Sequence, residues 1–256
     1  MSVDPAPGLP GPAAAAPCTV LPAGARRPEG WVRLEQEVRR SRFRAYLGRV
    51  ADEDEAREMV AELRRRHHDA RHVCSAFVLG PRRERMRSSD DGEPAGTAGT
   101  PMLEALVQRE TRPGHADLTD VCAVVVRWFG GVKLGAGGLV RAYSDAVSAA
   151  LATAPLLSRE RMALGTIAAP HADAGRWEND LRAAGVHVTA TDYAADAAWL
   201  HVAVADSPAA WLHVAVADSP AAWADLEQSL AGITAGSGRV ERVGEDWVDH
   251  DDDLAR

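Results

Sequence analysis

The sequence predicts an α+β protein with two domains. Short apolar segments with the patterns of strands alternate with segments whose apolar residues recur at helical spacing. This series of elements ends near Pro155 and then starts again. A chain of 256 residues is long enough for two small hydrophobic cores, and no apolar run approaches the length of a membrane span.

The first half opens with an alternating segment, Arg42–Val50, which predicts a strand. An amphipathic helix follows, acidic at Asp52 and basic at Arg66, so its charges match the helix dipole. Thr100 and Pro101 are typical of an N-cap followed by the first helical residue. Two further strands are expected at Val73–Leu79 and, as a buried central strand, Val121–Val126, and another helix after Gly138.

The second half has the element order βαββαβ, which is the ferredoxin-like arrangement. Its expected strands are Leu164–Ala168, Val186–Tyr193, Trp199–Val204 and Val240–Trp247, and its expected helices are Ala174–Ala184 and Ala221–Leu230.

A tandem repeat lies inside this second half. The twelve residues Ala197–Pro208 recur without substitution as Ala209–Pro220. A solenoid needs longer repeats and at least three of them. A ferredoxin-like sheet has one strand position in this part of the chain. We therefore expect one copy to form the third strand and the other to lie outside the sheet; a shift of twelve keeps the pleat parity for either copy.

The most informative motif runs from the apolar strand into a helix and reads Arg127-Trp128-Phe129-Gly130-Gly131-Val132-Lys133-Leu134-Gly135-Ala136-Gly137-Gly138-Leu139-Val140-Arg141-Ala142-Tyr143. It brings backbone N–H groups, cations and the positive end of a helix dipole together, which is how proteins bind anions. It fits neither a dinucleotide-binding fingerprint nor a Walker loop. The alternative is that its glycines only form a tight turn between strand and helix.

A second motif, Arg87–Gly99, contains two serines and three acidic residues among glycines and a proline, which indicates a loop. Asp90, Asp91 and Glu93 could bind Mg²⁺. We favour the alternative, in which they accept hydrogen bonds from the loop's own N–H groups and pair with Arg87 or Arg127. We expect Arg87–Gly99 and Arg127–Arg141 to face each other across one cleft, because the acids of one need the cations of the other.

Both motifs, and the chain from about Arg40 to Trp247, resemble the YigZ/Impact family. The resemblance implies a first domain like the second domain of ribosomal protein S5 and a ferredoxin-like second domain like one from the translocating elongation factor. It also implies a link to translation and to nucleic-acid binding. We accordingly expect a Pro/Ala/Gly-rich tail over 1–28, an Impact-type domain over 29–156, a ferredoxin-like domain over 160–248 with the duplication at 197–220, and an acidic tail over 249–256.

Composition limits the function classes. The formal net charge is −8, so the chain as a whole is not a basic nucleic-acid binder, although arginines crowd residues 26–87. Lys133 is the only lysine. The three cysteines, Cys18, Cys74 and Cys122, are too widely spaced for a disulfide framework or a zinc site, and they fit a reducing cytoplasm.

We therefore predict a cytoplasmic, non-catalytic regulator associated with translation that binds RNA or a ribosome-associated surface, with no metal, cofactor or membrane. The alternatives are a Mg²⁺-dependent enzyme acting on a nucleotide or phosphorylated small molecule, and a protein-interaction module. The candidate ligand-binding residues are Arg87, Ser88, Ser89, Asp90, Asp91, Glu93, Thr97, Arg127, Gly130, Gly131, Lys133, Gly135, Gly137, Gly138 and Arg141.

Overall fold

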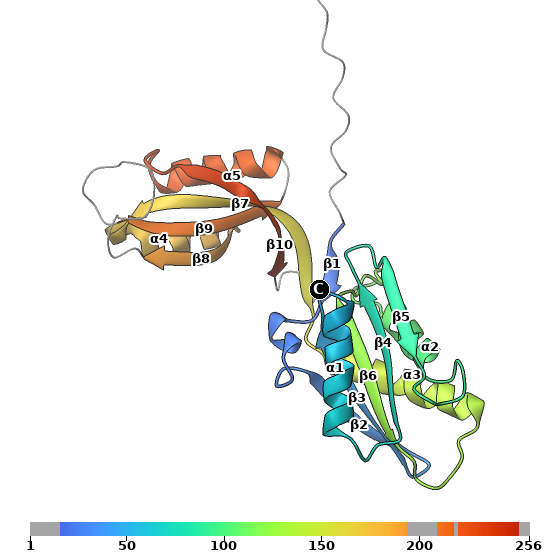
Figure 1. Cartoon of the computed structure of the whole chain (residues 1–256). Helices are drawn as coiled ribbons and strands as arrows, with labels where there is room; N and C mark the ends of the chain where they lie inside the picture. The colour runs from blue at the N-terminus through green and yellow to red at the C-terminus, as the bar shows by residue number, and fades with distance from the viewer. Residues whose placement is uncertain (1–15, 194–208, 218–219, 251–256) are drawn as a thin grey trace, which may run out of the picture. The chain divides into compact units, whose positions relative to one another are not determined.

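The computed structural model describes residues 16–193, 209–217 and 220–250 (Figure 1). The chain folds into two compact units. One contains Glu160–Val248, and the other contains Ala15–Arg159 together with the residues from Asp249 on.

The N-terminal unit is built on an antiparallel sheet of order β2-β3-β6-β4-β5. The strands are β2 (Val32–Val38), β3 (Ser41–Arg49), β4 (His72–Leu79), β5 (Arg85–Ser89) and β6 (Val121–Trp128). The sequence predicted β3, β4 and β6, but it did not predict β2 and β5. These two form the edges of the sheet, where one face meets solvent and the apolar pattern is weak.

Helices cover both faces of this sheet (Figure 1). They are α1 (Glu53–Arg66) on one face, and α2 (Gly99–Val107) and α3 (Ala136–Thr153) on the other. The central strand β6 serves both: Cys122, Val124 and Val126 pack on the α1 side, and Ala123 and Val125 pack on the α2/α3 side. This double burial explains why β6 reads as a continuous apolar run.

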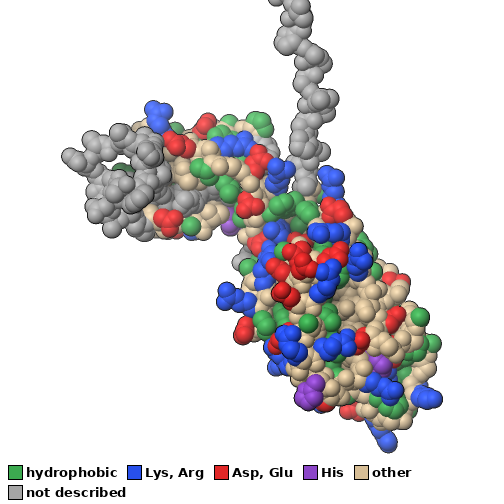
Figure 2. Space-filling view, viewed as in Figure 1, with side chains coloured by type: hydrophobic (Ala, Val, Ile, Leu, Met, Phe, Trp, Pro, Cys, Tyr) green, Lys and Arg blue, Asp and Glu red, His purple; other side chains and the backbone are tan. Residues whose placement is uncertain are grey.

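Helix α1 follows its sequence prediction closely. Asp52 is its N-cap, and the side chain accepts hydrogen bonds from Asp54 N and Glu55 N. Acidic side chains lie over one end of the helix and basic side chains over the other (Figure 2). Ala56, Met59 and Leu63 form its buried stripe.

The start of α2 differs from the prediction. The helix begins at Gly99, its N-cap is Ala98, and no side chain of the cap residue bonds the first turn. The Asp90 carboxylate does this instead, accepting hydrogen bonds from Ala98 N at 2.9 Å and Gly99 N at 2.8 Å. Thr100 therefore lies inside the helix, because a residue distant in sequence replaces the local cap.

Packed structure also begins earlier than residue 29, where we had expected the first domain to start. The short strand β1 (Cys18–Val20) pairs with Leu157–Arg159, and the 3-10 helix η1 (Ala23–Arg26) follows it. Val20 and Leu21 are fully buried. A few apolar residues of a Pro/Ala-rich segment can therefore be buried against a hydrophobic core that is formed mainly by later residues.

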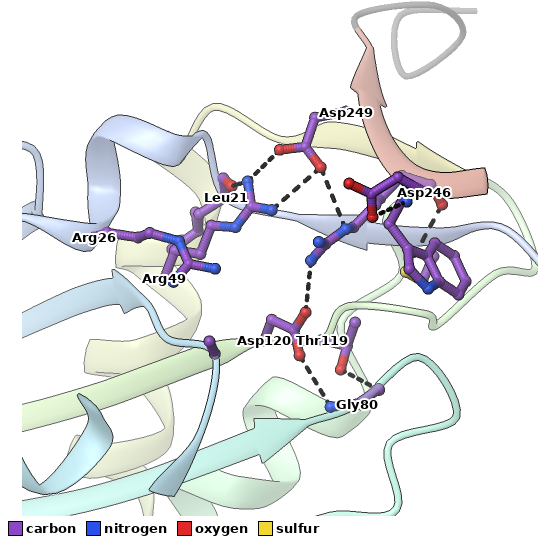
Figure 3. Close-up of polar contacts among 12 residues, drawn as sticks. Leu21, Arg26, Arg49, Gly80, Thr119, Asp120, Asp246 and Asp249 are labelled. Carbon is purple, nitrogen blue, oxygen red and sulfur yellow. Dashed lines mark hydrogen bonds and ion pairs between the residues drawn. The ribbon is translucent and has the colours of Figure 1, made fainter. Parts of the chain in front are cut away.

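A buried group of ion pairs involves a residue that we had assigned to an acidic tail (Figure 3). Arg49 is only 4% exposed, donates to Leu21 O at 3.0 Å and pairs with Asp249, which lies in β10 (Val240–His250). Arg159 pairs with Asp249 at 3.4 Å and with Asp120 at 2.8 Å. Asp249 is thus an ordered partner of two arginines, as a buried cation requires.

The C-terminal unit has the predicted order β7 (Leu157–Pro170), α4 (His171–Ala183), β8 (His187–Tyr193), β9 (Ala209–Ala217), α5 (Pro220–Ile233) and β10. β10 pairs with β7, β7 with β9, and β9 with β8. Ile167, Trp177, Leu181, Leu226 and Leu230 form its core. The fold class is therefore α+β, with an S5-domain-2-like domain followed by a ferredoxin-like domain.

The third strand of this sheet comes from the second copy of the repeat. Residues Ala209–Ala217 pair with Met162–Pro170 on one side and with His187–Tyr193 on the other. The predicted strand Trp199–Val204 and the rest of the first copy lie outside the described residues.

We expect deletion of Ala209–Pro220 to leave stability unchanged or raised. Because the copies are identical, deleting either one gives the same chain, and the remaining copy supplies the same residues to β9 in the same register. Three residues, Ala194–Asp196, would then join β8 to β9, a length that hairpins accept. Denaturant unfolding measures the effect, and a loss of several kcal/mol would show that both copies are needed.

Candidate functional site

The acidic loop is the segment 90–98 between β5 and α2; its first carboxylate holds the loop and the start of α2, and its second ties the loop to neighbouring elements. Asp90 accepts from Gly96 N at 2.8 Å as well as from the start of α2. Burial by itself raises the pKa of Asp90, but these three hydrogen bonds outweigh it and keep the pKa below its usual value. Asp91 accepts from Val73 N at 2.6 Å and from Arg64 at 2.7 Å, which ties the loop to β4 and α1.

The third carboxylate of the loop joins it to the Gly-rich motif. Glu93 is 8% exposed and Arg127 is 5% exposed, and Glu93 Oε1 lies 2.5 Å from Arg127 Nη1. The same oxygen accepts the hydroxyl of Tyr143 on α3 at 2.8 Å. Burial, followed by the influence of Cys74 and Glu93, raises the pKa of Tyr143 far above its usual value, so the phenol keeps its proton and donates.

Two further side chains from β4 lie next to this group. The Cys74 thiol is 3.4 Å from the Tyr143 hydroxyl and 3.0 Å from Asp90 O. Burial is the largest cause that raises the pKa of Cys74 to about 12, so its thiol is not a nucleophile at neutral pH. His72 Nδ1 lies 2.8 Å from Asp91 O, and its Nε2 is 3.9 Å from Glu93 Oε1.

These contacts bring the two predicted motifs together, as we expected. They meet in direct contact, through a buried ion pair with a shared tyrosine hydrogen bond, and not across the cleft that we had expected. All three carboxylates are engaged by the protein, which favours their role in holding the loop over a role as Mg²⁺ ligands. Arg127 is likewise committed to Glu93, so an external anion does not reach its guanidinium in this structure.

The Gly-rich loop is the segment 129–135 between β6 and α3, and it presents the exposed part of the predicted site. Gly131 and Gly135 have φ values of 85° and 76°, which suit glycine. Gly135 is the N-cap of α3; no side chain caps this end, and the first turn has no acidic residue. Lys133 and Arg141 are exposed, and neither has an acidic partner within the described parts of the chain.

The same loop also exposes apolar surface. Phe129 is 45% exposed, Val132 37% and Val140 38%. Trp128, by contrast, packs on the α1 side, where its indole N–H donates to Asp69 at 2.9 Å. Of the two aromatic residues at the end of β6, Phe129 is therefore the one with a ring available to a ligand.

The remaining candidate residues differ in their surroundings. Arg87 is exposed on β5 and lies 3.4 Å from Glu53. Ser88 and Ser89 are exposed on the same strand, and Thr97 donates to Pro94 O at 2.7 Å. Gly130 lies against the turn between β2 and β3, and Gly137 and Gly138 are in the first turn of α3. Tyr143, although it lies at the end of the Gly-rich motif, and Cys74 and His72 were not among the candidate residues, because a sequence pattern does not show which side chains meet through the fold.

Within the described residues, no group of three or more His, Cys, Asp or Glu side chains is arranged to hold a metal ion. No helix of the described parts is long and apolar enough to cross a membrane.

The solved structures contain similar folds. A crystal structure of a hypothetical protein aligns with a TM-score of 0.51 and 29% identity, covering 90% of this chain and 98% of that one. The structure of the two-domain translational regulator Yih1 aligns with a TM-score of 0.32 and 27% identity over 49% of this chain and 48% of that one.

The sequence comparisons identify relatives named as IMPACT family members. The IMPACT family member YvyE of Bacillus subtilis is 44% identical over 145 residues, which cover 57% of this chain and 64% of the relative. The IMPACT family member YigZ of Escherichia coli is 41% identical over 126 residues, 48% of this chain and 58% of the relative. The chain thus matches less than two thirds of the length of either relative. Residues 39–151 match the Impact N-terminal domain model, which identifies this part of the chain as an Impact-type domain similar to those relatives.

Proposed function

We propose that this protein is a non-catalytic, translation-associated regulator that binds RNA or a ribosome-associated polyanion in the cytoplasm. The family supports the translational part, since the resemblance implies a link to translation. The observation that carries the binding part is the uncapped N-terminus of α3, with Lys133 and Arg141 exposed beside it.

The physical argument compares charged groups that have a partner within the protein with those that do not. Each carboxylate of the acidic loop accepts from donors within the protein. Lys133 and Arg141 have no acidic partner within the described residues, in contrast to the paired arginines of α1. Free N–H groups at a helix N-terminus and two exposed cations favour a ligand with several negative charges. Phosphate groups meet this requirement.

The expected result is weak RNA binding that decreases steeply as salt increases. Each phosphate neutralised on a single strand contributes about 0.7 to the slope of log affinity against log salt. Lys133 and Arg141 together therefore account for a slope of about 1.4. Changing Lys133 to Ala should lower the slope by about 0.7, and fluorescence anisotropy with labelled RNA at several salt concentrations measures it.

The matched control is Arg57→Gln. Arg57 is an exposed arginine of α1 that pairs with Glu53 and Asp54 on its own helix. Its replacement also removes one positive charge, but we expect it to leave the slope unchanged. Saturable, Mg²⁺-dependent binding of one nucleotide that Asp91→Asn abolishes would contradict the proposal and support an enzyme. A folded protein that binds neither ligand would favour a protein partner.

A further inference from the structure

A second pair of exposed arginines lies next to the Gly-rich loop. The turn between β2 and β3 consists of Arg39 and Arg40, both exposed. Gly130 lies against this turn so closely that a Cβ there would be 1.9 Å from Arg40 O. Gly130 N also donates to Ser41 Oγ at 3.2 Å. The turn and the Gly-rich loop therefore form one continuous end of the N-terminal unit (Figure 1).

The backbone of this turn is unfavourable for the residues that occupy it. Arg39 and Arg40 have φ values of 47° and 66°, in the left-handed region. A two-residue hairpin turn with this conformation favours Asn-Gly, because the Cβ of most other side chains is strained there. Strain of this kind is often kept where a side chain has a function.

The charges of the turn are also unbalanced. In α1, the arginines Arg57, Arg64, Arg65 and Arg66 all pair with acidic residues. Arg39 and Arg40 have no acidic partner among the residues that the structure describes, and the same holds for Lys133. Blue Lys and Arg side chains project from this end of the unit (Figure 2).

The Gly-rich loop also carries an exposed aromatic ring, which directly follows β6 in the sequence. Phe129 is 45% exposed, and the buried Arg127 guanidinium lies 5.7 Å from the centre of its ring. An exposed aromatic face bordered by cations is the arrangement that binds single-stranded nucleic acid, in which unpaired bases stack on the ring and phosphates meet the cations. A duplex keeps the faces of its bases covered, so it cannot use the ring in this way.

We propose that Arg39 and Arg40 extend the anion site of the Gly-rich loop into a strip for single-stranded RNA, with Phe129 as the stacking residue. This rests on the proposed function and adds the class of nucleic acid and a second set of phosphate contacts. Four cations along the strip predict a salt slope of about 2.8, against about 1.4 for Lys133 and Arg141 alone.

The test uses the full chain and a fluorescein-labelled oligo(A) RNA of roughly 12 nucleotides, within the usual range of single-strand sites. The variant Arg39→Asn/Arg40→Gly removes both charges and installs the residues that the turn prefers, so its fold should be retained. We expect its salt slope to be lower by about 1.4. The control Arg57→Gln/Arg65→Gln removes two charges from α1 and should bind as the wild type does.

A second variant tests stacking. Phe129→Ser should weaken binding of oligo(A) but leave binding of inorganic polyphosphate unchanged. If Lys133→Ala weakens binding while Arg39→Asn/Arg40→Gly behaves like its control, the strip is overturned and the proposed function stands. Equal affinity for a duplex RNA of the same length would overturn the single-strand assignment. A wild-type protein that binds no RNA would overturn both proposals.

Discussion

Replacing Glu93 with Ala should destabilise the N-terminal unit by about 3–5 kcal/mol, the range found when one partner of a buried ion pair is removed. Arg127 would keep a buried guanidinium with only a 3.4 Å contact to Ser41 Oγ, and Tyr143 would lose its acceptor. Since whole domains are stable by only about 5–15 kcal/mol in general, a change of this size is easily measured by denaturant unfolding.

Glu62→Ala is the matched control. Glu62 also accepts from two arginines, Arg65 and Arg66, but all three lie exposed on α1, so we expect little change in stability. The double variant Glu93→Met/Arg127→Met should be less destabilised than Glu93→Ala, because it leaves no unpaired buried charge. If Glu93→Ala is as mild as Glu62→Ala, the ion pair does not stabilise the contact between the loops.

Gly130→Ala should cost about 3 kcal/mol, at the upper end of the usual effect of overpacking. The added Cβ would lie 1.9 Å from Arg40 O and 2.5 Å from Ser41 N, and both are backbone atoms that cannot rotate away. The turn between β2 and β3 would have to move from the Gly-rich loop. Thermal or denaturant unfolding gives the loss of stability.

Gly137→Ala separates this clash from a general effect of changing glycine. Gly137 is in the first turn of α3, and a Cβ there meets nothing within 4 Å. Because Ala favours the helical conformation over Gly by up to about 1 kcal/mol, we expect stability to be unchanged or slightly raised. Equal destabilisation by both substitutions would contradict the close packing of Gly130 on the turn.

Sequence patterns predicted the elements that carry their own signal. The valine run of β6, the dipole-matched charges of α1 and the order of the C-terminal elements all depend on residues close together in the chain. The start of α2 was placed wrongly, because Thr100 is a good local cap but Asp90 reaches the helix from outside that local stretch. The local capping preference of Thr100 is overridden because the fold places the Asp90 carboxylate at the start of the helix.

The sequence by itself also predicted that two motifs, one acidic and one glycine-rich with cations, lie together. Only the tertiary structure decided which of their charges pair with each other and which stay exposed. Register places Arg127 between Phe43 of β3 and His72 of β4, where Glu93 and Tyr143 meet it in a dry environment that requires a buried charge to be paired. Lys133, Arg141 and the turn arginines are exposed in the described structure, and whether a side chain is buried depends on contacts that no local pattern encodes.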